Sequence, residues 1–152
     1  MNDISPPDAA ASRFGHAQTL DILAASEPGA AKAFAETLID ELGAIEVLAS
    51  RTGIVMLPYV DTVQNTAFHL GEVLVSEAHI RLTGRNIEGY GAVVGRDLEH
   101  SMAMAIVDAC ITAGIGIKAI EAFLASEHHR QRKIDETRLR KVESTRVRME
   151  TF

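Results

Sequence analysis

Three side chains of complementary chemistry occupy every second position in one stretch of the chain: Glu77, His79 and Arg81. Their spacing of two predicts that they share one face of a β-strand. A carboxylate, an imidazole and a guanidinium on one face could transfer a proton or bind an anion. The alternative is a solvated sheet face on which these charges pair with their neighbours. We favour the solvated face.

A second polar group, Gly95, Arg96 and Asp97, lies where a strand is expected to end and a helix to begin. Backbone N–H groups, the positive end of the helix dipole and a guanidinium would together suit an anion or an interface. Asp97 is also a good N-cap residue, and its negative charge would compete with a bound anion. Capping is therefore the interpretation we favour.

Farther along the same helix, His100 and Asp108 fall on the edge that the apolar residues leave free. They could act as an acid and a base, but a single histidine at such a position is more often a surface or interface residue. The catalytic candidates are thus Glu77, His79, Arg81, His100 and Asp108. The sequence does not identify any of them as catalytic.

Several other kinds of site find little support. His128 and His129 are adjacent, so they point in different directions on a helix, and no metal-binding spacing occurs; no metal is expected. The glycines do not follow the spacing of a phosphate-binding loop, and no cofactor of this chain is expected. Cys110 lies in an apolar helical run, which predicts a buried, unreactive thiol in a reducing compartment.

Charge is unevenly distributed along the 152 residues, whose formal net charge is −6. Residues 1–125 hold 7 Lys and Arg against 16 Asp and Glu, whereas residues 126–152 hold 8 against 5. The acidic body of a second copy or of another subunit would complement the basic tail, and a homodimer or higher oligomer is expected. A nucleic-acid arm is the weaker alternative, because the tail also carries acids and its one aromatic residue closes the chain.

Neither an apolar run of about 20 residues nor the pattern of a signal peptide is visible in the sequence. We therefore expect a cytoplasmic protein without a membrane partner.

The elements that would position these residues follow the order of two helices, four strands and two helices. Short loops favour antiparallel pairing, so the expected fold class is α+β, with a sheet of about four strands. An N-terminal helical hairpin should cover one side of this sheet, with Pro28 in the first turn of its second helix and Gly43 at its end. The expected helices span residues 9–25 and 28–42, and the expected strands span residues 44–50, 54–60, 71–82 and 89–95.

Two stretches of the expected strands predict a turn and a close approach. Thr52-Gly53 is expected to form a tight turn, and the run Ile54–Leu57 is apolar on both faces, as in a central strand. Gly89, Gly91 and Gly95 share one face of the last strand and leave room for a ligand or a packed helix, and we favour the helix.

The C-terminal part of the sequence changes character along its length. The helix expected over 97–113 is apolar on two sides, which predicts burial on two sides. After another helix from Ile117, a tail of residues 126–152 keeps only a narrow apolar stripe, so it is either frayed or docked on a partner. We expect a single domain over 1–125 and a partner-docking, largely helical tail over 126–152.

Taken together, a series of short motifs from residue 43 onward resembles one family, the G subunit (PhnG) of the bacterial carbon–phosphorus lyase core complex, which breaks down phosphonates. The motifs that carry the resemblance are Arg51-Thr52-Gly53, Leu70-Gly71-Glu72 with Glu77-Ala78, Gly89-Tyr90-Gly91, Gly95-Arg96-Asp97, His100 with Asp108-Ala109, and Val142 with Thr145-Arg146-Val147 and Met149-Glu150-Thr151-Phe152.

The resemblance implies a subunit that contributes, with its companions, to ATP-dependent activation of alkylphosphonates. In that reaction adenine is displaced and the phosphonate becomes linked to ribose 5-triphosphate. The family supplies no established catalytic residue for this subunit, and ATP is a substrate of the complex. Three hypotheses follow: a binding or structural subunit of that transferase complex, a free-standing small enzyme that uses the residues above, or a nucleic-acid-binding adaptor.

Overall fold

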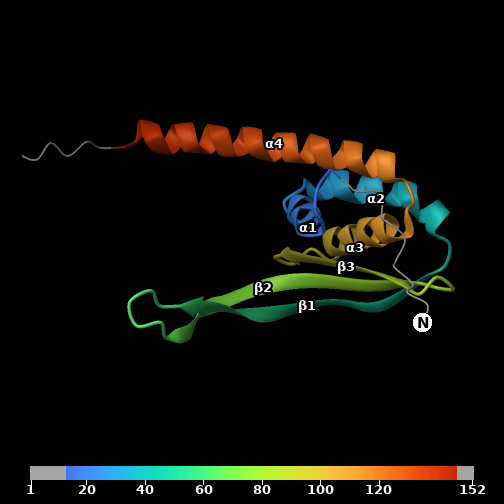
Figure 1. The fold of residues 1–152 in the computed structure, drawn as a ribbon, viewed down its shortest axis with the longest axis horizontal. Coiled ribbons are helices and arrows are strands. Elements are labelled where there is room, and N and C mark those ends of the chain that lie inside the picture. Colours follow the sequence, from blue (N-terminus) through green and yellow to red (C-terminus); the bar gives the residue numbers. More distant parts are fainter. Residues whose placement is uncertain (1–12, 147–152) are drawn as a thin grey trace, which may run out of the picture.

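The computed structural model describes residues 13–146 and places a layer of helices on one face of an antiparallel sheet (Figure 1). The α+β class expected from the sequence is confirmed. The elements in chain order are α1 (His16–Ala24), α2 (Pro28–Leu42), β1 (Ile45–Val60), β2 (Ala67–Leu82), β3 (Ile87–Val94), α3 (Leu98–Ala113) and α4 (Ile117–Ser144).

The sheet has three strands in the order β1-β2-β3, which corrects the expectation of about four. The tight turn expected at Thr52-Gly53 is wrong, because both residues lie within β1 and pair with Ser76 and Val75 of β2. Two expected strands are therefore one strand of 16 residues, with irregularities after Val47 and after Leu57. A glycine inside a long strand resembled a turn because the sequence alone does not show the partner strand.

The loop expected over residues 61–66 is confirmed as the connection between β1 and β2. The carboxylate of Asp61 accepts hydrogen bonds from the backbone N–H of Val63 and Gln64, at 3.2 and 2.9 Å. These bonds close the turn and hold the pKa of Asp61 below its usual value, chiefly through Gln64. β1 and β2 thereby form one long hairpin.

Helix α3 lies directly on the sheet, and the glycines of β3 permit that approach. A Cβ atom at Gly89 would clash with the backbone oxygen of Ala105 and lie 2.7 Å from the Cβ of Ala109. The same is true of Gly91 against α3, so the packed-helix interpretation of these glycines is confirmed. Alternate residues of β2, among them Ala78, Ile80 and Leu82, are buried beneath α3.

The N-terminal helices pack mainly on α3, and not directly on the sheet as the sequence had suggested. α2 packs on α3, and α3 lies between α2 and the sheet. α1 contacts α3, α4 and β3. α3 is therefore buried on two sides, as its two apolar stripes predicted. Residues 9–12 of the first expected helix lie outside the described residues. α2 begins as expected, with Pro28 in its first turn and the Glu27 carboxylate accepting from the N–H of Gly29 and Ala30.

Helix α4 is continuous for 28 residues and leaves the body of the molecule partway along its length (Figure 1). Ile120 and Leu124 are buried against the body, and the Gln131 amide donates to the Ile22 carbonyl oxygen at 2.8 Å. From Arg132 onward every described residue of the helix is exposed. Residue 126, proposed as a domain boundary, lies inside this helix, and the division at that point stays a prediction.

Candidate assembly surface

Of the polar row on β2, Glu77 points to the face opposite the helices, since its neighbours Ser76 and Ala78 are buried beneath them. Its carboxylate accepts hydrogen bonds from Arg51 on β1 and, at 2.9 Å, from the hydroxyl of Tyr90 on β3. These bonds, that of Arg51 first, lower the pKa of Glu77. Partial burial and the neighbouring carboxylate in turn raise the pKa of Tyr90.

The other two members of the row share one partner, Glu88 of β3. The His79 ring nitrogen Nε2 lies 2.8 Å from one Glu88 oxygen, and the Arg81 guanidinium donates to the other at 2.7 and 3.0 Å. Arg81, followed by His79, lowers the pKa of Glu88. The row thus has the ion pairs that the solvated-face interpretation predicts, and its use in catalysis stays a hypothesis.

At the start of α3, Asp97 is the N-cap residue, and its carboxylate accepts from the His100 N–H at 2.9 Å. The hydroxyl of Ser76 accepts from the Asp97 N–H and donates to the Gly95 carbonyl oxygen. An anion at this point would have to displace groups that the fold already uses. Arg96 is exposed, and within residues 13–146 its guanidinium has no hydrogen bond or ion pair.

His100 was expected at the surface or at an interface, and the structure corrects this, because only 5% of the residue is exposed. Its Nε2 donates to the Leu23 carbonyl oxygen at 2.8 Å and lies 3.1 Å from the hydroxyl of Ser26. His100 lies on the edge of α3 that the apolar stripes leave polar, and the connection between α1 and α2 covers this edge at His100. His100 therefore fastens α3 to the N-terminal helices.

Asp108 is buried at the opposite end of α3 and joins three elements. One carboxylate oxygen lies 2.8 Å from Nε2 of His16 on α1, and the other accepts from the Tyr90 N–H of β3 at 2.9 Å. His100 and Asp108 have no partner in common, so the structure does not bring them together as an acid–base pair. Both use their polar atoms within the fold.

Cys110 is fully buried in α3, as predicted. Burial, with a smaller contribution from the charge of Glu41, raises the pKa of its thiol to about 11. Among residues 13–146, no group of three or more His, Cys, Asp or Glu side chains could hold a metal ion. Within the same range, no helix is both long enough and apolar enough to cross a bilayer.

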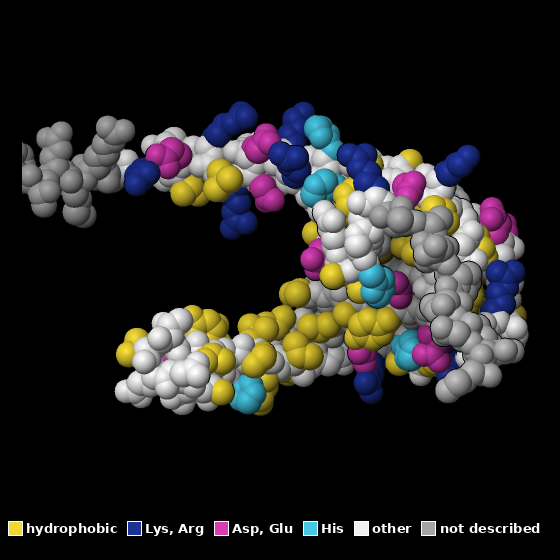
Figure 2. All heavy atoms as spheres, in the orientation of Figure 1, with side chains coloured by type: hydrophobic (Ala, Val, Ile, Leu, Met, Phe, Trp, Pro, Cys, Tyr) yellow, Lys and Arg dark blue, Asp and Glu magenta, His cyan; other side chains and the backbone are white. Residues whose placement is uncertain are grey.

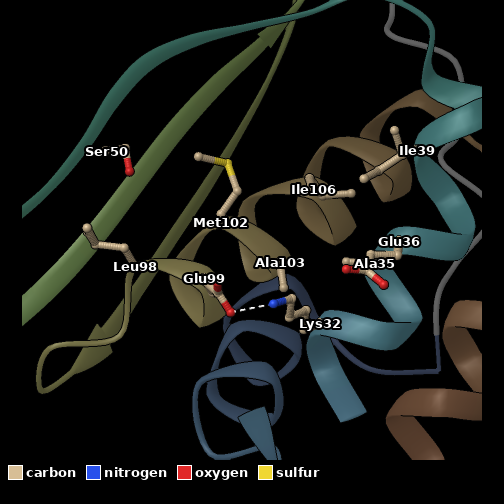
Figure 3. Close-up of a pocket in the computed structure, with 10 residues that line it drawn as sticks. All are labelled: Lys32, Ala35, Glu36, Ile39, Ser50, Leu98, Glu99, Met102, Ala103 and Ile106. Carbon is tan, nitrogen blue, oxygen red and sulfur yellow. Dashed lines mark hydrogen bonds and ion pairs between the residues drawn. The ribbon is translucent and has the colours of Figure 1, made fainter. Parts of the chain in front are cut away.

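A groove of about 340 Å³ lies between α2, α3 and β1 (Figure 3). Its lining is mainly apolar, with side chains that include Ile39, Met102 and Ile106. Its charged lining residues are Lys32, Glu36 and Glu99; Lys32 pairs with Glu99 at 2.6 Å, and this contact raises the pKa of Lys32. The groove therefore presents no unpaired cation at that pair to bind a phosphonate or a nucleotide phosphate.

The most exposed apolar surface lies on the far half of the long hairpin, residues 53–74, which we call the hairpin arm. β3 ends at Val94 opposite Val75, so the hairpin arm has two strands, and α4 runs above it without packing on it (Figure 1). Its exposed large apolar side chains include Ile54, at 65%, Leu70, at 63%, and Met56, at 58%. Its only Asp, Glu, Lys or Arg residues are Asp61 and Glu72.

This finding corrects the interpretation of Ile54–Leu57 as part of a central strand. β1 is an edge strand, and the apolar residues of this run are exposed on both faces. An isolated two-stranded hairpin is at best marginally stable in water, so an arm of this composition needs a covering surface. The signal in the sequence that could have identified this surface is the length of the two nearly uncharged apolar runs on either side of the loop at residues 61–66.

The far part of α4, residues 132–144, forms a second projection, which we call the helical arm. It carries three exposed apolar residues, Ile134, Leu139 and Val142. Figure 2 shows hydrophobic side chains along the hairpin arm and along α4 on the two sides that face one hollow. A recess of about 460 Å³ runs along α4, and its lining combines one apolar residue and one threonine with four basic residues: Ile134, Thr137, Arg130, Lys133, Arg138 and Lys141.

Hydrogen bonds of Glu127 and Arg130, which come just before the helical arm in α4, hold the arm in place. Glu127 is buried and accepts hydrogen bonds from the Glu27 N–H and from Arg130, and Arg130 also donates to the Ala25 carbonyl oxygen. The hollow is bordered by the hairpin arm, which is apolar and nearly uncharged, and by the helical arm, which is basic. Such a pair of surfaces suits docking of a protein better than it suits catalysis.

Comparison with known proteins adds one match. The model of a protein family described as phosphonate metabolism protein PhnG matches residues 16–152, which is most of the chain. A search of curated proteins found no match. The matched span includes every element from α1 to α4.

Proposed function

Because the chain belongs to the PhnG family of phosphonate metabolism proteins, we propose that it is a non-catalytic assembly subunit of the bacterial carbon–phosphorus lyase core complex. In this proposal it contributes to ATP-dependent activation of alkylphosphonates, in which ribose 5-triphosphate is transferred to the phosphonate and adenine is released. ATP is a substrate of the whole complex, and this chain holds no cofactor of its own. The complex would work in the cytoplasm.

One observation carries the proposal, namely the uncovered apolar surface of the hairpin arm. If fully buried, a side chain such as Ile54 or Leu70 would contribute about 1.5–3 kcal/mol, and the fold leaves both more than 60% exposed. Contiguous exposed apolar surface of this kind marks protein interaction sites. The position of such a surface on a projection from the body favours a subunit whose role is to contact its companions.

The charged side chains support the same proposal. The candidates on β2 pair with residues of β1 and β3, and those on α3 are buried and hydrogen-bonded within the fold. A general acid or base must instead be within reach of a substrate proton. A role in positioning companion subunits requires no such group.

The experiment is reconstitution of the complex with and without this chain. The chain should co-elute with the companion subunits in size-exclusion chromatography, and adenine release from ATP in the presence of an alkylphosphonate should require it. Failure to co-elute would refute the proposal. Adenine release by the isolated chain would show instead that it is an enzyme in its own right.

A further inference from the structure

β3 covers only part of the edge of β2, so the backbone groups of β2 beyond the end of β3 have no partner strand on that side within residues 13–146. On the outer edge of β3, the Tyr90 N–H donates to the buried Asp108 carboxylate at 2.9 Å. On β2, the last backbone bond to the β3 side runs from the Gly95 N–H to the Leu74 carbonyl oxygen at 2.8 Å. Beyond Leu74, in the direction of Phe68, β2 has no neighbouring strand on this side within the described residues.

The direction of the backbone groups on this free edge follows from the pairing. Successive residues of a strand point their N–H and C=O groups to alternate sides. Because the Leu74 carbonyl faces the β3 side, the N–H and C=O of Glu72 face the same free edge. Those of Gly71 and Val73 face β1, with which both residues pair.

The side chains beside this edge are mainly apolar. Between Phe68 and Leu74 there is no proline and no lysine, two devices that proteins use to block an edge strand; the segment carries one carboxylate, that of Glu72, and one irregularity of its pairing with β1, at Leu70. Phe68, Leu70 and Leu74 are 43%, 63% and 37% exposed. The edge therefore offers unpaired backbone groups together with apolar side chains, which are the two requirements for strand addition.

We propose that the β2 edge from Phe68 to Leu74 receives an extended strand from a different subunit, in line with β3, and that the same subunit presents an acidic surface to α4. The inference rests on the proposed function and specifies how the partner docks. The added strand would supply the third strand that the hairpin arm lacks. Its apolar side chains would lie beside Leu70 and Leu74.

Charge favours a different subunit over a second copy of this chain. The recess along α4 is lined by four basic residues and no acidic ones. A second copy paired antiparallel through the same β2 edge would bring its own basic α4 over the same side of the joint sheet. Two like-charged helices would then share one hollow, whereas an acidic partner surface would be attracted to it.

The test compares Glu72→Pro with Glu72→Thr in the reconstituted complex. Proline removes the N–H that faces the free edge but leaves the pairing of Gly71 and Val73 with β1, and prolines are tolerated on sheet edges. Threonine removes the same carboxylate and keeps the N–H. Glu72→Pro should weaken association with the companion subunits about tenfold or more, and Glu72→Thr should leave it within about twofold.

Amide hydrogen exchange in the wild-type complex gives a second measurement that does not depend on how the proline variant folds. The Glu72 N–H should exchange at least about tenfold more slowly in the complex than in the isolated chain. Amides of Gly71 and Val73, which already face β1, should change less. Equal association of the two Glu72 variants, or an unchanged Glu72 amide, would overturn the strand proposal even if the wild-type chain co-elutes with its companions.

A wild-type chain that does not co-elute would refute the proposed function and the strand proposal together. The isolated chain provides the remaining control, because the alternative occupant is a second copy. If the isolated chain is a dimer that Glu72→Pro dissociates and Glu72→Thr does not, the edge binds a second copy and the proposal of a different subunit is wrong. An isolated chain with the same oligomeric state in both variants agrees with the proposal.

Discussion

Replacement of Gly91 by alanine tests the contact on which the whole fold depends, that of β3 with α3. A Cβ at this position would clash with the Ser101 carbonyl oxygen and lie 2.8 Å from both the Ala105 nitrogen and the Met104 Cβ. Comfortable separations between such atoms are about 3.5–4.0 Å, so α3 would have to move away by roughly 1 Å. Because the obstacles are backbone atoms and a Cβ, a change of rotamer cannot relieve the clash.

Overpacking of a core costs about 1–3 kcal/mol, and we place Gly91→Ala at the upper end of that range. For a chain of this size, a loss of about 3 kcal/mol corresponds to a fall in Tm of roughly 6–12 °C. Urea unfolding would give the free energy directly, provided that the slope with denaturant is unchanged. The loss should be shared by Gly89→Ala, which meets Ala105 and Ala109 in the same way.

Gly53 and Gly71 provide matched controls in the same sheet. An added Cβ at either position meets nothing within 4 Å, so alanine should change the free energy of unfolding by less than about 1 kcal/mol. If the free energy of unfolding of Gly91→Ala lay within about 0.5 kcal/mol of the wild-type value, α3 could not lie against β3 as described.

Three further predictions concern single side chains. His100→Ala should lower the free energy of unfolding by about 1–3 kcal/mol in urea, since it leaves the buried Leu23 carbonyl with one partner fewer; an unchanged value would contradict the role of His100 as a fastening. Glu77→Gln should leave adenine release by the reconstituted complex within about twofold, because the carboxylate only pairs with Arg51 and Tyr90; loss of turnover with intact assembly would favour the enzyme hypothesis. Cys110 has a thiol pKa raised from 9.0 to about 11, so the unfolded chain loses that proton first and stability should fall as pH rises from about 9 to 11. Cys110→Ala should remove that part of the pH dependence, and identical profiles for the two proteins would contradict it.

Local signals were sufficient to predict the boundaries of α2, the start of α3 and the direction of side chains along β2, whereas α1 begins at His16 and not at residue 9. Pro28 and Gly43 bracket α2, and Asp97 caps α3, because each acts on backbone groups within a few residues of itself. Alternation along β2 likewise placed Glu77 and Ala78 on opposite faces. These features depend on chemistry that is contained in a short stretch of sequence.

Features that depend on distant partners were not predictable in the same way. His100 and Asp108 bind groups that lie 77 and 92 residues away in the chain, and helical spacing gives no information about either partner. The continuity of β1 through Gly53 depends on its pairing with Val75, and the exposure of Ile54 depends on where β3 ends. The family resemblance, by contrast, followed from the order of many short motifs and was confirmed.

The proposed contact of the hairpin arm with the companion subunits can be tested by comparing the affinities of two lysine variants. Met56→Lys places a charge on the arm, whereas Val47→Lys places the same charge on the body end of the same strand, at a residue of similar exposure, 54% against 58%. Binding of each variant to the companion subunits would be measured by titration. We expect Met56→Lys to weaken binding at least about tenfold and Val47→Lys to leave it within about twofold. Equal affinities for the two variants would contradict the account.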